Sequence, residues 1–320
     1  MSSYKGSREA FAAAMMQLAE EDPCYVTISP DSMKAMRMVE FAEKHPKRFF
    51  EVGIAEQNAV GCAAGMASCG LVPFVATYSG FLTMRACEQV RTFVAYPQLN
   101  VKLVGANGGI FGGEREGVTH QFFEDIGILR SIPEMTIVVP SDASQVFAAT
   151  LAIAKRPGPA FLRVANGREA VIFDKEIPFE IGKARKLVEN GTDVALMTCG
   201  FILSRVLKAA EVLKTEGINA TVLEVHTLKP LDKAGIASLL DETGAVVTVE
   251  DHNVIGGLGS AVAEVIAEHA PAALVRVGLQ DVFPESGPAE ALLDHYKMGV
   301  DDIVKAAKVA MAKRDHRRAG

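Results

Sequence analysis

The stretch Phe49-Phe50-Glu51-Val52-Gly53-Ile54-Ala55-Glu56-Gln57-Asn58-Ala59-Val60 joins a short apolar strand, which ends at Gly53, to a helix. This helix is expected to pack very close to its neighbours, because it is rich in the small residues Ala59, Gly61, Ala63, Ala64, Gly65 and Ala67. A glutamate is rarely buried without a partner, so Glu56 at the start of such a helix needs an explanation. Either its charge simply suits the positive end of the helix dipole, or it is a catalytic carboxylate. This segment alone leaves both interpretations open.

Strand-like and helix-like segments alternate along the chain. A helix is expected over residues 7–20, and apolar strands over 24–29, 49–53, 71–78, 100–105, 136–140 and 161–164. Such alternation predicts an α/β fold with a mostly parallel sheet. Functional loops of these sheets follow the carboxyl ends of the strands, and Asp31, Glu56, Tyr78 and the loop 105–120 all occupy such positions.

The pattern changes between residues 172 and 192, where charged residues, Pro178 and Gly191 interrupt it. We therefore expect a first domain over residues 1–175, a linker or edge strands over 176–192, and a second α/β domain over 193–320. Strands of the second domain are expected at 193–198, 220–225, 245–249 and 273–277. The basic tail 313–318 is expected to be a solvated, frayed end.

Charge, composition and cysteine content indicate which classes of protein this chain can belong to. A net charge of −6, with 49% apolar and 22% charged residues, is typical of a globular protein and argues against binding to nucleic acid or to an anionic membrane. The five cysteines are odd in number and form no CxxC pair, which indicates free thiols in a reducing compartment. No signal peptide is visible, and no apolar run reaches the roughly 18 residues of a membrane span. We predict a cytoplasmic protein.

A glycine-rich segment, residues 105–121, combines glycines with acidic residues, an arginine and His120. Glycines let the backbone approach a ligand closely, and histidine changes charge near neutral pH. The segment is either a ligand-binding loop or a flexible surface loop with a capping histidine. Neither a Walker nor a dinucleotide-binding spacing occurs in it.

Taken together, these segments resemble the C-terminal half of transketolase and of the related 1-deoxyxylulose-5-phosphate synthase. The resemblance lies in residues 51–59, 78–81, 85–91, 117–121, 228–232 and 249–260, in order and over nearly the whole chain. It implies a thiamine-diphosphate enzyme whose pyrimidine-binding domain is followed by a transketolase C-terminal domain.

The resemblance also implies roles for individual residues around the cofactor. Glu56 stands where the family has the glutamate that hydrogen-bonds N1′ of the aminopyrimidine and activates the cofactor. Phe81, with Tyr78 beside it, matches the aromatic residue that stacks on the pyrimidine, although both rings could instead belong to the core. His120 matches the histidine that contacts the donor sugar and assists proton transfer.

Other positions concern the substrate. Arg163 matches a basic residue that binds the substrate phosphate, with an ordinary salt bridge as the alternative, and Ser32, beside Asp31, matches in part the serine of that phosphate site. The family has a histidine where this chain has Asn107, and an aspartate where it has Glu116. The first change removes a cationic phosphate contact and the second lengthens a carboxylate that contacts a sugar hydroxyl, so we expect a phosphorylated or unusual ketose donor.

The family holds the diphosphate through Mg²⁺ bound to a Gly-Asp-Gly motif, which residues 1–320 lack. No metal ligand is therefore expected in this chain. We expect the second subunit of a split transketolase, in an α₂β₂ assembly whose N-terminal subunit supplies the Mg²⁺ and diphosphate site.

Two other functions stay open. One is the beta subunit of a 2-oxo acid dehydrogenase decarboxylating component, which does not usually carry Gly-x-Thr-His-Gln followed by Glu124-Asp125. The other is a non-catalytic partner that keeps the fold, against which the retained Glu56 and His120 argue.

Overall fold

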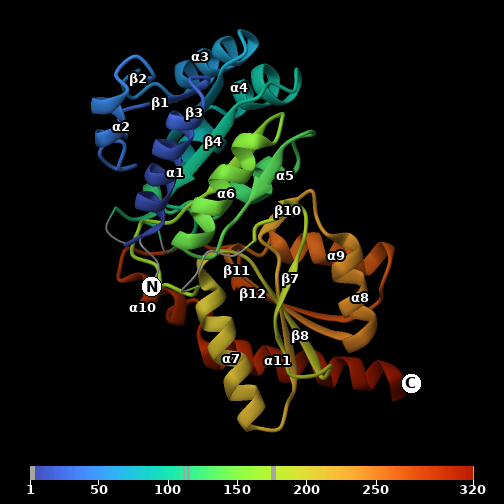
Figure 1. The fold of residues 1–320 in the computed structure, drawn as a ribbon. Coiled ribbons are helices and arrows are strands. Elements are labelled where there is room, and N and C mark those ends of the chain that lie inside the picture. The colour runs from blue at the N-terminus through green and yellow to red at the C-terminus, as the bar shows by residue number, and fades with distance from the viewer. Residues whose placement is uncertain (1–3, 111, 114–115, 174–177, 320) are drawn as a thin grey trace.

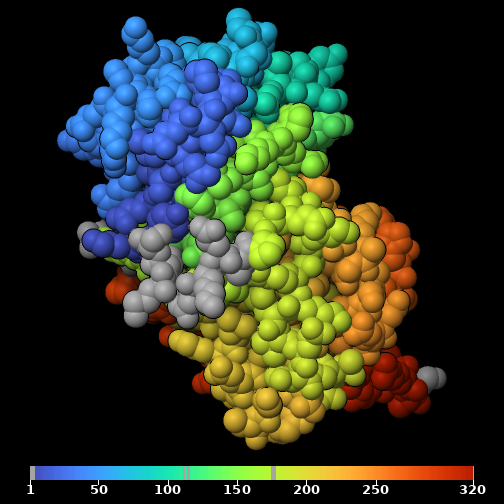
Figure 2. All heavy atoms as spheres, in the orientation of Figure 1, coloured from blue at the N-terminus to red at the C-terminus, as the bar shows by residue number. Residues whose placement is uncertain are grey.

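The computed structural model describes residues 4–110, 112–113, 116–173 and 178–319, which form two α/β units stacked end to end (Figure 1). Within these ranges, one sheet has seven strands in the order β10-β5-β6-β4-β3-β1-β2, and the other has five in the order β12-β11-β8-β9-β7. The two units meet along a broad contact on the face that Figure 2 shows. The expectation of two α/β domains with mostly parallel sheets is confirmed.

The first sheet consists mainly of parallel strands: β1 Tyr25–Ser29, β2 Phe49–Glu51, β3 Val72–Tyr78, β4 Lys102–Ala106, β5 Thr136–Val138 and β6 Ala160–Arg163. The central strands are buried along nearly their whole length, because helices cover both faces of the sheet. The helices of this unit are α1 Ser7–Glu21, α2 Val39–Lys44, α3 Glu56–Ser68, α4 Cys87–Gln89, α5 Asp125–Arg130 and α6 Ala143–Lys155.

The segment between β3 and β4 is helical but irregular. Wide π-type turns at Phe81–Arg85 and Val90–Ala95 flank the short α4. Such turns often occur at functional sites, because they redirect side chains that a regular helix would place elsewhere. Here the first π-type turn carries Phe81 and Arg85.

The second sheet contains β7 Arg185–Glu189, β8 Val194–Thr198, β9 Ala220–Glu224, β11 Ala245–Asn253 and β12 Ala273–Leu279. Its helices are α7 Leu203–Thr215, α8 Lys233–Thr243, α9 Leu258–Glu268, α10 Ala289–His295 and α11 Val300–Ala319. Side chains of α7 and α11 share one apolar core with this sheet. Side chains of α8 and α9 belong to a core that continues into α3 and α5 of the first unit, so apolar packing joins the two units.

Two short strands lie at the edges of the sheets. β7 falls inside the segment expected to hold a linker or edge strands, and it pairs antiparallel with β9. β10, Thr227–Lys229, belongs to the second half of the sequence but pairs antiparallel with β5 of the first sheet. The expected boundary at residues 175–176 lies outside the described residues, so the division at 1–175, 176–192 and 193–320 stays a prediction.

The basic tail 313–318 is largely exposed, as expected, but the expectation of a frayed end is wrong. Helix α11 runs through it to Ala319, and Arg314 Nη1 donates to the carbonyl oxygens of Asp193 at 2.6 Å and Thr243 at 3.1 Å. Arg317 donates to the carbonyl of Ala272 at 3.2 Å. The physical reason is that arginine can lay its apolar stem along a protein surface while its head reaches carbonyl groups. In the described ranges, no helix has the length and apolar character needed to cross a membrane.

Candidate active site

Glu56 is the first residue of α3, and its side chain is only 1% exposed. Both carboxylate oxygens lie 2.8 Å from Nη1 of Arg85, whose side chain is 46% exposed. The partner that a buried glutamate requires is therefore an arginine, and the two form an ion pair. Because Arg85 ends the π-type turn after β3, this pair joins two loops at the carboxyl edge of the sheet.

Arg85 also lies over an aromatic ring, with its Cζ 4.2 Å from the ring centre of Phe81, which favours a cation–π contact. The Phe81 ring meets three other rings edge-on, at centroid distances of 5.8 Å to Tyr78, 5.4 Å to His120 and 5.5 Å to Phe122. We call Tyr78, Phe81, His120 and Phe122 the ring cluster. The structure thus brings four residues selected from the sequence, Glu56, Tyr78, Phe81 and His120, into one connected site.

Gly80 makes room for the ring cluster. A Cβ atom at this position would lie 2.1 Å from Cδ1 and 2.3 Å from Cε1 of Phe122, far closer than real contacts. The backbone of Gly80 is in the ordinary right-handed helical region, so the demand for glycine is steric rather than conformational. The close approach lets the Phe122 ring reach the edge of Phe81.

A cavity of about 540 Å³ lies beside the ring cluster. Phe81, Arg85 and Phe122 line it from the first unit, and Phe283, from the segment after β12, lines it from the second. Glu124 also lines it, and partial burial raises the pKa of that carboxyl. The lining of the cavity thus includes three aromatic rings, one cation and one carboxyl whose pKa is raised.

Asn107 lies at the border of the ring cluster, after the end of β4. It is buried and has a left-handed backbone with φ of 58°. Its Oδ1 accepts a hydrogen bond from Arg8, whose Cζ lies 5.8 Å from the ring centre of Tyr78. Its Nδ2 has no hydrogen-bond partner among the described residues, so this amide keeps a free donor for a ligand.

Asp31 and Ser32 follow β1 at the same edge of the sheet. Ser32 is buried and its Oγ lies 2.7 Å from Oγ1 of Thr77, the residue before Tyr78. Asp31 is exposed, and its backbone N–H donates to Glu51 at 2.6 Å. Glu116 is exposed in the glycine-rich segment. The substrate roles of Asp31, Ser32 and Glu116 stay predictions.

Arg163 is placed differently from the expectation of a phosphate ligand. It is 4% exposed, and its Nε donates to Asp125 at 2.8 Å while Nη2 donates to the carbonyls of Phe122 and Asp251, each at 3.0 Å. This geometry agrees with the salt-bridge alternative, because the guanidinium is buried between the two units and bonded to protein groups. The phosphate-binding role of Arg163 stays a prediction. The buried Asp125, which also accepts from Ser79, balances its charge.

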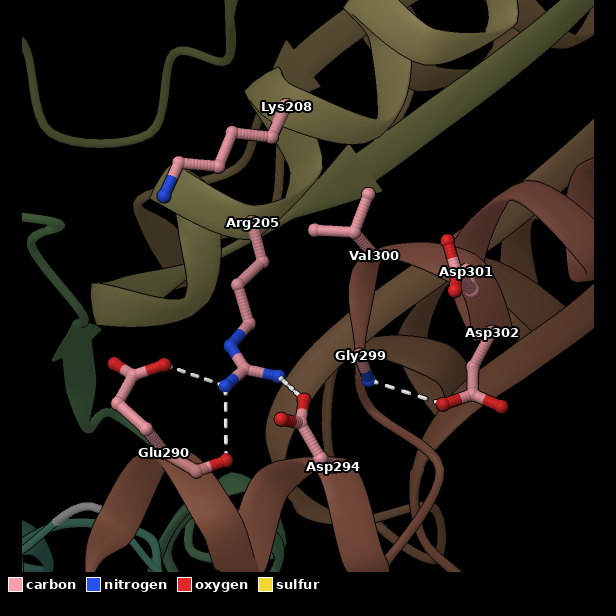
Figure 3. A pocket seen from close by; sticks show the side chains of 8 residues that line it. All are labelled: Arg205, Lys208, Glu290, Asp294, Gly299, Val300, Asp301 and Asp302. Carbon is pink, nitrogen blue, oxygen red and sulfur yellow. Dashed lines mark hydrogen bonds and ion pairs between the residues drawn. The ribbon is translucent and has the colours of Figure 1, made fainter.

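A second cavity, of about 420 Å³, lies in the second unit between α7, α10 and the start of α11 (Figure 3). Arg205 points toward Glu290 and Asp294 and forms ion pairs with both. Its donors are thus used to tie α7 to α10. Across the described ranges, no group of three or more metal-ligating side chains could hold a metal ion.

Comparison with known proteins agrees with this arrangement. Residues 5–168 match the transketolase pyrimidine-binding domain, and residues 182–303 match the transketolase C-terminal domain. The chain belongs to the transketolase family. The 6-deoxy-6-sulfo-D-fructose transketolase subunit of Clostridium sp. (strain MSTE9) is 40% identical over 311 residues, which cover 97% of this chain and 96% of that protein.

Two further members are similar over most of their length. One of the subunits of the apulose-4-phosphate transketolase of Phocaeicola vulgatus is 34% identical over 301 residues, covering 94% of this chain and 96% of the relative. A solved structure described as a split gene transketolase, inactive beta4 tetramer, is 39% identical and superimposes with a TM-score of 0.88, covering 96% of this chain and 98% of that one. The chain is thus a transketolase-family subunit of the split type, in a family that depends on thiamine diphosphate.

Sequence reasoning missed three residues of the site. Arg85 stands inside a motif that supports the family resemblance, but nothing in its spacing indicates that it pairs with Glu56. Phe122 directly follows the motif 117–121. The glycine at position 80 is the sequence feature that could have indicated the close approach of the Phe122 ring. Arg8 is distant from Asn107 in sequence, and only the packing of α1 brings the two side chains together.

Proposed function

We propose that this chain is the subunit of a split transketolase that binds the pyrimidine end of thiamine diphosphate and transfers a two-carbon ketol unit from a phosphorylated ketose to an aldose. The observation that carries the proposal is the joining of Glu56 to Phe81 and His120 through Arg85 at the carboxyl edge of the first sheet. A carboxyl, an aromatic face and a histidine are the groups that the resemblance requires, and they come from three separate segments.

The described residues fit the pyrimidine end of the cofactor. Glu56 would hold N1′, and Phe81 would offer its ring face, with the neighbouring cavity of about 540 Å³ giving room. When bound, thiamine diphosphate supplies the carbon nucleophile that reacts with the ketose carbonyl. Both Glu56 oxygens contact Arg85 in this structure. Glu56 must therefore give up part of this pairing to share a proton with the pyrimidine.

His120 would act on the sugar. Its ring is partly exposed at the ring cluster, and its Nδ1 lies 3.0 Å from Oγ1 of Thr119. We propose that Nε2 exchanges a proton with a donor hydroxyl, which is a role that suits histidine. The aromatic neighbours would keep water away from that exchange.

A partner subunit would supply Mg²⁺ and the diphosphate site. The described residues include no candidate metal cluster, and the names of the relatives from Clostridium and Phocaeicola call each a subunit of a transketolase. The related beta4 tetramer is described as inactive, which supports a need for another chain. We propose an α₂β₂ assembly in the cytoplasm, with both the stoichiometry and the compartment resting on the sequence-based expectation.

The two relatives also support an anionic sugar. One is named for a sulfonated fructose and the other for apulose 4-phosphate. The free Nδ2 donor of Asn107 suits a neutral or anionic oxygen, and it replaces the histidine of the family pattern. We therefore propose that Asn107 contacts the sugar, and that a phosphorylated ketose is the donor.

The experiment is ketol transfer by the chain co-purified with the product of a neighbouring gene that encodes a Gly-Asp-Gly motif. Glu56→Gln should lower turnover at least about 100-fold, because it removes the proton-sharing carboxyl. The exposed Glu88→Gln, in α4, is the matched control and should leave turnover unchanged. Activity of Glu56→Gln above a tenth of wild type would refute the role of Glu56.

The alternatives have distinct outcomes in the same assay. Decarboxylation of a 2-oxo acid without ketol transfer would identify the dehydrogenase component, although both family domains match transketolase. A wild-type complex that forms but transfers no ketol unit from sugar phosphates would indicate the non-catalytic partner.

A further inference from the structure

The segment that carries His120 and Phe122 is held in place from the second unit. Asp251, near the end of β11, accepts a hydrogen bond at its Oδ1 from the backbone N–H of Ile110 at 2.8 Å. Ile110 is fully buried and Asp251 is 7% exposed. A carboxylate that bonds a buried backbone N–H is a strong link, because losing it leaves the donor unpaired away from water.

Gly109 shows how closely the two units approach at this link. A Cβ atom there would lie 2.1 Å from Oδ2 of Asp251, and the glycine has a left-handed backbone with φ of +82°. Its N–H donates to the carbonyl of Phe122 at 2.7 Å. The Asp251 carboxylate therefore lies against the backbone turn that is itself bonded to Phe122.

Arg163 strengthens the same link from the first sheet. Its Nη2 joins the carbonyl oxygens of Asp251 and Phe122, and its Nε bonds Asp125. The backbone N–H of Asn253 then donates to the carbonyl of Phe123 at 2.8 Å. The carbonyls of two consecutive phenylalanines are thus fixed by groups that belong to the second unit or are bonded to it.

We propose that Asp251 is a positioning residue, which sets the place of His120 and Phe122 in the ring cluster by holding residues 108–110 and 116–124 from the second unit. The second unit thus helps to position residues of the candidate active site in the first unit. Its effect on turnover rests on the proposed function, whereas its effect on the segment does not.

The first test measures backbone hydrogen exchange in the purified full chain. Asp251→Ala should speed exchange of the amides of residues 108–110 and 116–124, Ile110 included, about tenfold or more, because the hydrogen bond to a charged group is lost. Asp251→Asn keeps an oxygen acceptor without its charge and should give a smaller increase, about threefold. Asp232→Ala is the matched control, since Asp232 accepts backbone N–H groups of Ala184 and Gly235 within the second unit.

This control should leave exchange in residues 108–110 and 116–124 unchanged. Wild-type exchange of that segment in Asp251→Ala would overturn the proposal. If Asp251→Ala does not fold, Asp251→Asn decides: faster exchange confined to the segment supports the proposal, and an increase spread evenly over the chain overturns it.

The second test is a double-mutant cycle in the assembled enzyme. Asp251→Ala should lower kcat about tenfold, and in a His120→Ala background it should have little further effect, because it acts through His120. Independent, multiplicative losses would contradict positioning. If the wild-type complex transfers no ketol unit, the proposed function fails, and the exchange measurement alone still supports or overturns the positioning role.

Discussion

Gly80→Ala tests whether the ring cluster depends on the close approach of Phe122. The added methyl would lie 2.1 Å from Cδ1 of the Phe122 ring, and the ring must move by about 1.3 Å to reach the 3.4 Å of ordinary contact. Alanine suits the helical backbone of Gly80, so the substitution introduces no backbone strain of its own. Its whole unfavourable effect should come from the displaced ring.

The magnitude follows from the packing around that ring. Phe122 is 5% exposed and contacts the rings of Phe81 and His120, so it cannot shift without losing these contacts. Overpacking a well-packed site typically costs about 1–3 kcal/mol. We expect the lower half of this range, because Phe122 also lines the cavity beside the cluster and can rotate toward it.

The assay is denaturant unfolding of the isolated chain, followed by fluorescence and circular dichroism. The midpoints of unfolding are compared between variants whose unfolding transitions have equal slopes. Gly61→Ala, in α3, is the matched control, because a Cβ at that position meets nothing within 4 Å. It should stabilise the chain by about 0.5–1 kcal/mol through helix propensity. Ketol transfer by the assembled enzyme should fall only for Gly80→Ala.

The reasoning is refuted if Gly80→Ala raises the midpoint of unfolding as Gly61→Ala does. That result would mean that the Phe122 ring does not lie against the backbone of Gly80. A loss of stability with unchanged ketol transfer would refute the narrower claim that Phe122 keeps Phe81 and His120 in their working arrangement.

Two other predictions concern stability. Burial lowers the pKa of His226 to about 4, and since an unfolded histidine titrates near 6.5, the unfolded chain binds the extra proton between these values. The contribution of His226 to the free energy of unfolding should therefore rise, by on the order of 3 kcal/mol, as the pH increases from about 4 to 6.5. Urea titrations should show that this part of the pH dependence is lost in His226→Gln and retained in the exposed control His316→Gln. Arg314→Ala should lower the free energy of unfolding by about 1–3 kcal/mol, because two carbonyl contacts are lost, whereas the neighbouring exposed Lys313→Ala should change it by less than about 0.5 kcal/mol; equal effects of the two substitutions in thermal or denaturant melts would contradict this account of α11.

Much of the fold could be predicted because buried strands leave a strong local pattern. Each strand expected from the sequence begins within two residues of an observed one. The basic end of α11 could not be predicted in this way. Its charged residues indicate solvent exposure, and only the folded chain shows that carbonyls of Asp193 and Thr243 lie within reach of Arg314.

The residues that lie together were predictable where several family motifs occur in order along the chain. Glu56, Phe81 and His120 were selected because their segments resemble those motifs, and the structure brings them together. For Arg163 the sequence left two roles open, because an arginine at a strand end serves equally as an anion ligand or as one half of a buried ion pair. The choice depends on Asp125, which the folding of the first unit brings near, and on the carbonyl of Asp251, which approaches when the two units pack.

The short strand β10 belongs to one domain by its sequence and to the sheet of the other domain by its pairing. Its residues 227–229 belong to the C-terminal domain by sequence, since that match covers 182–303, yet they close one edge of the first sheet by pairing with β5. A fragment cut between residues 168 and 182 would expose the buried strand β5 as an open edge, which invites pairing between molecules. The sheet of the pyrimidine-binding domain is therefore completed by a strand from the C-terminal domain. A fragment designed to fold by itself must include a replacement for that strand.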